Sequence, residues 1–70
     1  MKSTTDIWFA SFLIELRGYK LHDYHVIARG RGRFNFKISD EDWKREKMLF
    51  MQSDVSKLKQ GQEKLKDLLF

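Results

Sequence analysis

The sequence predicts a single small α+β domain over residues 1–70, in the order helix, strand, strand, helix, helix. Three observations support this fold class. An apolar run with helical spacing occupies residues 6–17, two strand-like stretches flank a pair of glycines in the middle of the chain, and two segments with helix-capping residues follow. A two-stranded hairpin is marginal alone in water, so we expect it to pack on the helices.

The first helix is predicted over residues 6–17. Thr4 or Thr5 can accept hydrogen bonds from the free amides of its first turn, and Gly18 can provide a left-handed C-cap. A helix that is apolar over most of its circumference must be covered on more than one side, which predicts either a central helix or a dimer interface. Its apolar residues are Phe9, Phe12, Leu13 and Leu16 on one face and Ile7, Ala10 and Ile14 on nearly the opposite face.

The middle of the chain changes to the period of two that is typical of strands. Residues 19–29 are rich in Tyr, Val and Ile, and residues 33–38 (RFNFKI) alternate between apolar and polar side chains. Gly30 and Gly32 suit a tight turn between the two strands. The alternation assigns Phe34, Phe36 and Ile38 to one face and Arg33, Asn35 and Lys37 to the other.

Two registers of this hairpin stay open. A two-residue loop at positions 30 and 31 would place Ile27 and His25 on the face of the phenylalanines. A three-residue loop would place Ala28 and Val26 there instead, and this choice puts fewer polar groups in the core.

Two helices follow the second strand. SDED at residues 39–42 resembles a capping box, with Asp42 in place of the usual Glu, so Ser39 should begin a helix that ends near residue 52. This helix carries Trp43, Phe50 and Met51 on one face.

Ser53 or Asp54 then begins the third helix. Gly61 lies within its apolar stripe, where a glycine costs about 1 kcal/mol of helix propensity, so we interpret Gly61 as a point of close approach by another backbone. The stripe consists of Val55, Leu58, Leu65, Leu68 and Leu69.

The composition limits the class of protein. A chain of 70 residues with no cysteine has no disulfide and no thiolate metal site, and it buries only about 60% of its unfolded surface. A second copy is the simplest supplement to so small a core, so we expect a homodimer. Lys2 and the apolar run at residues 7–14 resemble a signal peptide, but the run is short and lies between Asp6 and Glu15. We therefore expect a cytoplasmic protein with no membrane partner.

No residue pattern predicts catalysis. His22 and His25 are three positions apart, which places them on opposite faces of a strand, so they cannot chelate one metal ion together. The acidic run at residues 40–42 is explained by the free amides and the dipole at a helix N-terminus. The sequence contains no nucleophile motif and no phosphate-binding loop. We expect no catalytic residue, no metal site and no cofactor.

Positive charge is concentrated in the first half of the chain. Residues 1–38 carry seven basic and three acidic groups, whereas residues 39–70 carry seven of each, so the net charge of +4 lies before residue 39. The planar guanidinium of arginine suits phosphates, and a two-stranded ribbon fits the major groove of B-DNA. The sequence therefore predicts that a basic hairpin binds nucleic acid or an acidic protein surface. The candidate residues are Arg29, Arg31, Arg33 and Lys37, with Lys20 and Arg17 extending the surface.

Three segments carry a likeness to a known family: TTDIWFASFLIELRGYKL at residues 4–21, GRFNFKISD at residues 32–40 and LKDLLF at residues 65–70. On these segments the chain resembles a family of small bacterial and phage-type proteins whose function is itself unassigned. The resemblance implies a compact α+β domain of the kind found in mobile-element neighbourhoods, and it transfers no catalytic residue.

Two hypotheses of function follow. The first is a small non-catalytic accessory protein, of phage or mobile-element type, that binds nucleic acid through the basic hairpin. The second is a protein–protein interaction module, an inhibitor or adaptor, that uses the same hairpin or a sheet edge against an acidic protein surface.

Overall fold

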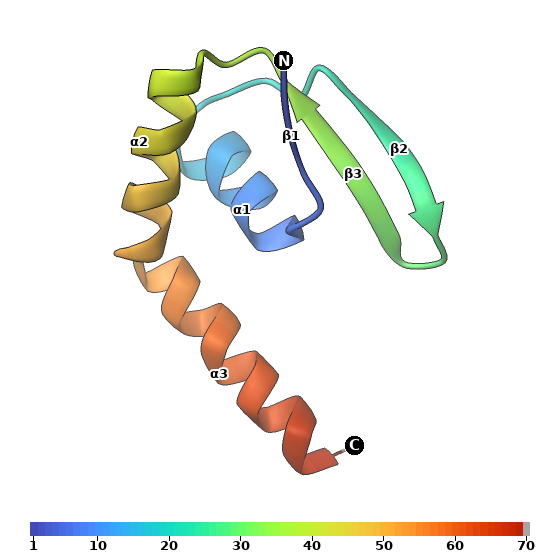
Figure 1. Ribbon diagram of the computed structural model, residues 1–70. Coiled ribbons are helices and arrows are strands. Elements are labelled where there is room, and N and C mark those ends of the chain that lie inside the picture. Colours follow the sequence, from blue (N-terminus) through green and yellow to red (C-terminus); the bar gives the residue numbers. More distant parts are fainter. Residues whose placement is uncertain (70) are drawn as a thin grey trace.

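The computed structural model describes residues 1–69 and confirms the small α+β fold (Figure 1). Helix, strand, strand, helix and helix follow one another as predicted, after an additional strand near the N-terminus. The three strands form an antiparallel sheet in the order β1-β3-β2. Phe70, which ends the LKDLLF segment, lies outside the described residues. The elements are β1 (Lys2–Thr4), α1 (Ile7–Ser11), η1 (Phe12–Leu16), β2 (Asp23–Ala28), β3 (Arg31–Phe36), α2 (Asp40–Met51) and α3 (Asp54–Leu69).

The additional strand β1 lies along the edge of β3 that the hairpin leaves free. Lys2 pairs with Phe36 and Thr4 with Phe34 in antiparallel register. A strand of 3 residues is too short to display a period of two, so no alternation in the sequence reveals it. With β1 in place, β3 becomes the central strand of a three-stranded sheet, which is more stable than an isolated hairpin.

The first helix begins at Ile7, and its N-cap is Asp6. The Asp6 carboxylate accepts hydrogen bonds from the backbone N–H groups of Trp8 (2.9 Å) and Phe9 (3.3 Å). Thr4 instead accepts a hydrogen bond from the backbone N–H of Asp6 (3.1 Å). The prediction of a threonine cap is therefore wrong, because one oxygen of Asp6 satisfies two free amides at once.

The last turn of this helix, η1, is a π-helix. The backbone N–H of Arg17 donates to the carbonyl of Phe12, five residues earlier (3.1 Å), and Gly18 follows with φ 76°, as the predicted C-cap requires. Leu13 is fully buried, whereas Leu16 is 63% exposed. The prediction that Leu16 shares a face with Phe12 and Leu13 is therefore wrong, because Leu16 lies within a π turn, which has more residues per turn than the α-helical spacing assumed.

The core lies between the sheet, the first helix and α2. The Phe9 ring packs edge-on against Trp43, with ring centroids 5.1 Å apart, and lies 5.3 Å from the ring of Phe50. The first helix is covered on two sides within one chain (Figure 1), in accord with the central-helix alternative. The buried apolar residues are Phe9, Ala10, Phe12, Leu13, Phe36, Ile38, Trp43 and Phe50.

The β-hairpin adopts neither of the two predicted registers. Its loop occupies positions 29 and 30, one position earlier than expected. Val26 lies opposite Gly32 and Ala28 opposite Arg31, and an irregularity between these pairs leaves Ile27 as the extra residue of a β-bulge. Because of the bulge, the even-numbered residues of β2, Tyr24 and Val26, lie on the same face of the sheet as Phe34. The length of the loop alone does not reveal this arrangement.

β2 is an exposed edge strand. Every residue of β2 is exposed, and the apolar side chains of Tyr24 and Val26 are 62% and 75% exposed. Only the end of the ribbon near α2 enters the core, where Phe36 is fully buried. The tip of the hairpin therefore extends beyond the helices (Figure 1).

The predicted starts of the two C-terminal helices are confirmed. The Ser39 hydroxyl accepts a hydrogen bond from the backbone N–H of Asp42 (3.2 Å), and α2 ends at Met51. The Ser53 hydroxyl accepts one from the backbone N–H of Ser56 (3.4 Å), so Ser53 is the cap of α3.

α3 is attached to the rest of the molecule only near its N-terminal half and projects away beyond it (Figure 1). Val55 packs against the core and Ser56 is buried, but every residue from 62 to 69 is exposed. The predicted leucine stripe is present, yet its leucines face solvent. Within residues 1–69, no atom outside the helix lies within 4 Å of a Cβ built on Gly61, so the close backbone approach expected there does not occur inside this chain.

Candidate nucleic-acid interface

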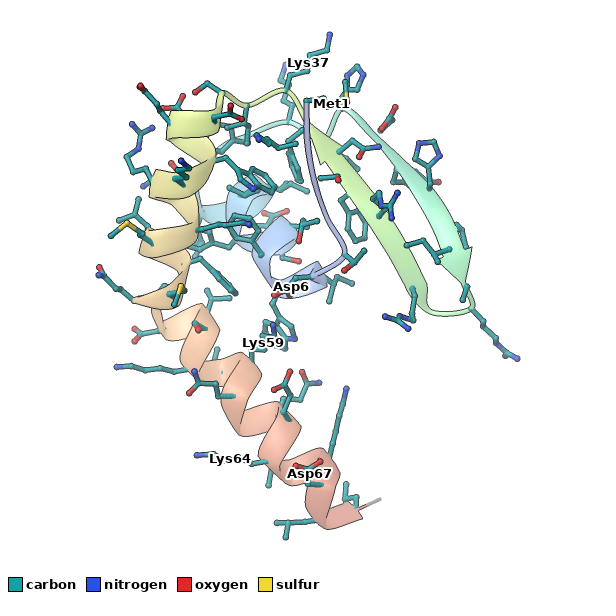
Figure 2. All side chains as sticks on the ribbon, viewed as in Figure 1. Met1, Asp6, Lys37, Lys59, Lys64 and Asp67 are labelled. Carbon is teal, nitrogen blue, oxygen red and sulfur yellow. The ribbon has the colours of Figure 1, made fainter. Side chains whose placement is uncertain are left out.

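Most of the predicted cations form one exposed surface on the hairpin, here called the basic hairpin surface. Arg29 lies in the loop, Arg31 begins β3 and Arg33 lies within β3. Lys37 follows β3 and Lys20 precedes β2. All of these side chains are exposed, and Lys37 points away from the body of the molecule (Figure 2).

Glycines set the spacing of the arginines at the hairpin tip. Gly30 adopts φ 75°, which lets the chain reverse within the two-residue loop. A Cβ at Gly32 would make an ordinary contact with the backbone oxygen of His25, at 3.4 Å, so the strand pairing does not require a glycine at this position. The arginines at positions 29, 31 and 33 alternate with these two glycines.

The face of the sheet opposite the core carries polar side chains from two strands. Arg33 lies opposite His25, and Asn35 lies opposite Asp23. The Asn35 amide donates a hydrogen bond to the Asp23 carboxylate, which also lies 4.0 Å from Nε2 of His22. Asp23 is the one acidic residue between positions 17 and 37, and its contacts are with Asn35 on the paired strand and with His22, its neighbour in the chain.

The positive charges of the basic hairpin surface have no ion-pair partner within residues 1–69. The lysine and arginine ion pairs of the described residues use other cations, and their acidic partners are Asp6 and acids of α2 and α3. Uncompensated charge on an exposed ribbon raises the local electrostatic potential and attracts anions. The cations that are paired are Lys2, Arg17, Arg45, Lys57 and Lys59.

The basic hairpin surface has two ends. Arg29, Arg31 and Arg33 occupy the tip, whereas Lys20 and Lys37 both line a hollow beside Ile38 at the opposite end. Four strand positions separate residues 33 and 37, a distance of about 13 Å along an extended chain. The surface therefore follows the length of the ribbon and is not concentrated at one point.

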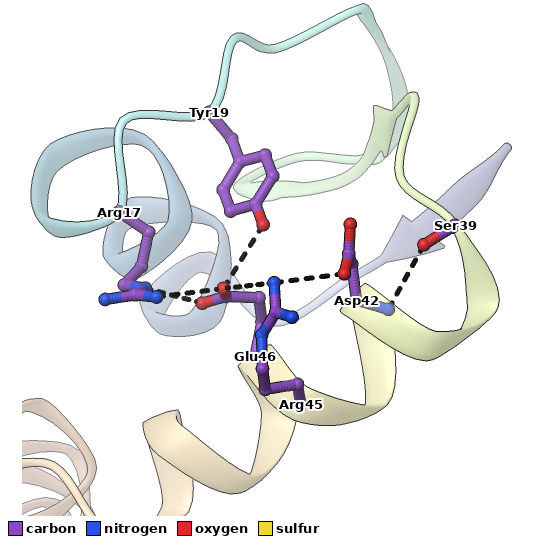
Figure 3. A network of polar contacts seen from close by, with 6 residues as sticks. All are labelled: Arg17, Tyr19, Ser39, Asp42, Arg45 and Glu46. Carbon is purple, nitrogen blue, oxygen red and sulfur yellow. Dashed lines mark hydrogen bonds and ion pairs between the residues drawn. The ribbon is translucent and has the colours of Figure 1, made fainter.

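Arg17 does not belong to this surface. Its guanidinium holds the Glu46 carboxylate with two hydrogen bonds, from Nε to Oε2 (2.7 Å) and from Nη2 to Oε1 (3.2 Å) (Figure 3). The charge of Arg17 predicts a place on the basic hairpin surface, but this charge is matched by an acid on α2. The sequence offers no signal for the pair, because its two residues are 29 positions apart.

Glu46 is an ionised acid inside the fold. It is 1% exposed, and the Tyr19 hydroxyl donates a further hydrogen bond to its Oε1 (3.2 Å). The hydrogen bond from Arg17 holds the pKa of Glu46 below its ordinary value despite burial, and the same contact raises the pKa of Arg17. The network ties the segment after the first helix to α2 (Figure 3), which is a structural role.

Other acids also serve local structure. Asp40 pairs with Lys2, and this contact lowers the pKa of Asp40, while Asp42 pairs with Arg45 (3.0 Å). In the part of the chain that the structure describes, no three His, Cys, Asp or Glu residues are grouped so that they could hold a metal ion. Among residues 1–69, no helix is both long enough and apolar enough to cross a membrane.

Two further hollows are present, and one of them borders the basic hairpin surface through Arg31. One of about 550 Å³ lies between the start of α1, the end of α2 and α3, and it contains the ion pair between Lys59 and Asp6 (2.6 Å; Figure 2). The other, of about 410 Å³, lies on the apolar side of the hairpin and is lined by Ile7, Tyr24 and Val26.

The chain matches no protein-family model, no curated protein and no solved structure.

Proposed function

We propose that this protein is a small non-catalytic accessory protein, of the phage or mobile-element type that its sequence resembles, and that it binds nucleic acid through the basic hairpin surface. The observation that carries the proposal is the set of exposed cations at positions 20, 29, 31, 33 and 37, none of which has an ion-pair partner within residues 1–69. Such cations gain free energy by displacing the counterions of a phosphate backbone.

The shape of the hairpin supports the same proposal. A twisted two-stranded ribbon has the width of the major groove of B-DNA, and arginine binds phosphate through a planar pair of N–H groups. The aromatic side chains of the ribbon do not favour base stacking, because Phe34 and Phe36 face the core and Tyr24 lies on their side of the sheet. Contacts to phosphates carry little sequence information, so the proposed binding has weak sequence preference.

A titration of labelled duplex DNA, single-stranded DNA and RNA at two salt concentrations tests this proposal. We expect affinity to fall steeply with salt, and we expect Arg31→Ala with Arg33→Ala to weaken binding at least about tenfold and to reduce the salt slope by about 2. Lys57→Ala with Lys64→Ala is the matched control, because it removes the same charge from exposed positions of α3. Absence of binding at low salt, or an equal loss in both double variants, would contradict the proposal.

The second candidate function is an inhibitor or adaptor that binds an acidic protein surface. It is favoured by β2, an edge strand whose residues are all exposed and which can accept an added strand from a partner. The two candidates differ in their dependence on salt. Strand addition uses backbone hydrogen bonds of β2 and should persist at high salt, whereas phosphate contacts through Arg31 and Arg33 should weaken steeply.

The proposal also includes a cytoplasmic location, where nucleic acid is accessible, no membrane partner, and a homodimer. The homodimer is supported by the size of the chain and by the exposed leucines of α3.

A further inference from the structure

α3 presents its apolar side to solvent and its polar side to its own body. Ser56 is buried and Lys59 forms an ion pair with Asp6, so these residues mark the side of α3 that faces the molecule. The leucines lie elsewhere on the helix, and a large exposed apolar stripe is unusual on a protein that stays monomeric. Leu58, Leu65, Leu68 and Leu69 are 64%, 62%, 82% and 78% exposed.

The stripe has the spacing of a coiled coil. Its members alternate by steps of three and four, which is the a/d pattern of a heptad repeat. Leucine occupies both d positions, whereas Val55, the first a residue, packs against the core of its own chain, so the exposed part of the stripe begins at Leu58. The a/d residues of α3 are Val55, Leu58, Gln62, Leu65 and Leu69.

We propose that a second copy of this chain occupies the stripe, with the two α3 helices parallel and in register. The charges beside the stripe decide the orientation. In a parallel pair, Asp54 of each copy lies next to Lys59 of the other, which stays paired with Asp6 of its own chain. Gly61 lies next to Lys66, so no like charges meet there. In an antiparallel pair, Lys59 would instead face Lys66, which places like charges together. The flanking residues therefore complement a parallel second copy.

Gln62 supports the in-register arrangement. It occupies the central a position of the stripe, between Leu58 and Leu65, where an apolar residue would strengthen association. A single polar side chain at an a position lowers stability but specifies register and oligomeric state, because the two amides hydrogen-bond only when they are paired. Two Gln62 amides meet in this way when the helices are in register.

The interface is small. α3 has 16 residues, which corresponds to a length of about 24 Å and to about two heptads. Such a contact is at the low end of protein interfaces, so the dimer should dissociate on dilution. A parallel pair also places both bodies at the same end of the assembly, so that one particle carries two basic hairpin surfaces.

Sedimentation equilibrium without nucleic acid tests whether a second copy of the chain covers the leucine stripe. The average mass should rise from 8.5 kDa toward twice that value as the concentration increases. Leu58→Ala with Leu65→Ala should raise the dissociation constant at least about 30-fold while the circular dichroism spectrum stays unchanged, because both leucines are exposed in the monomer. Ile7→Ala is the control, since Ile7 is 62% exposed on a different apolar surface.

Other outcomes would contradict the proposal or assign the stripe to another partner. A mass of 8.5 kDa at every concentration up to about 1 mM would overturn the proposal, since even weak dimers form in that range. A dimer that Ile7→Ala disrupts and the leucine variant does not would overturn it as well. A monomer that floats with vesicles of anionic lipid would assign the stripe to a membrane surface instead. Arg31→Ala with Arg33→Ala should leave the mass unchanged, so the dimer and the nucleic-acid proposal can fail independently.

Disulfide trapping tests the orientation, because residues 1–69 contain no cysteine. In a parallel, in-register pair, Leu58→Cys alone should give a disulfide-linked dimer under mild oxidation, since equal d positions face each other. In an antiparallel pair, neither single variant would link to itself, and only a mixture of Leu58→Cys with Leu65→Cys would form a linked species. That second result would overturn the parallel arrangement.

Discussion

The centre of the molecule and its two projections follow different physical rules. In the centre, the first helix, α2 and the inner end of β3 bury a group of mostly aromatic side chains, and the buried acid Glu46 has its hydrogen-bond partners. The hairpin tip and α3 project from this centre (Figure 1), and their arginines and leucines are exposed. Folding accounts for the buried side chains of the centre, but it does not account for the exposed arginines and leucines of the projections. The difference indicates where a partner would bind.

The largest expected effect comes from comparing one apolar residue in each region. Phe36→Ala removes a fully buried ring and should cost about 3–5 kcal/mol, which approaches the whole stability of so small a domain. Val26→Ala removes a side chain that is 75% exposed and should change stability by less than about 0.5 kcal/mol. Urea unfolding followed by tryptophan fluorescence measures both. Similar losses in the two variants would show that β2 is covered in solution.

A smaller effect is expected at Glu46. Glu46→Gln keeps the shape of the side chain but removes the charge that Arg17 binds, so it should lower the free energy of unfolding by about 2 kcal/mol at neutral pH. Glu41→Gln is the matched control, because Glu41 is an exposed acid on the same helix.

The pH dependence has a definite sign. Because the folded-state pKa of Glu46 is lowered, its ionised form stabilises the fold above the ordinary glutamate pKa of about 4.3, and this stability is lost as pH falls through the folded-state value. The pKa of Asp40 is lowered too, so Glu46→Gln should reduce the acid sensitivity of unfolding without abolishing it. An unchanged acid sensitivity in Glu46→Gln, measured by urea unfolding between neutral and acidic pH, would contradict this assignment.

The sequence predicts the elements that have local signals better than those that depend on distant contacts. Helical spacing, the Ser39 cap and the alternation of residues 33–38 are local signals, and the structure follows them. The N-terminal strand, the bulge at Ile27 and the π turn depend on contacts with distant residues or on a single inserted residue, which no local period reveals.

The candidate site shows the same limit. Charge alone assigned Arg17 to the basic hairpin surface, although it pairs with Glu46, while the remaining cations proved to be exposed. Periodicity likewise identified the stripe on α3 but not that it faces away from the molecule. An amphipathic pattern records that a helix has an apolar side, and it does not record whether the same chain covers that side.

The smallest expected effect is at Gly61, and its sign is the reverse of the others. Gly61 lies inside α3 without a positive φ, and a Cβ there would contact nothing within 4 Å, so Gly61→Ala should raise the stability of the monomer by about 0.5–1 kcal/mol. Thermal unfolding in the monomeric Leu58→Ala, Leu65→Ala background isolates this gain from association. In the wild-type background the dimer should tolerate the alanine, because Gly61 flanks the proposed contact and is not part of its a/d stripe. A dissociation constant that rises about tenfold or more would instead place Gly61 at the crossing point of the two helices, and the contact would then be centred on Leu58, Gly61, Leu65 and Leu68.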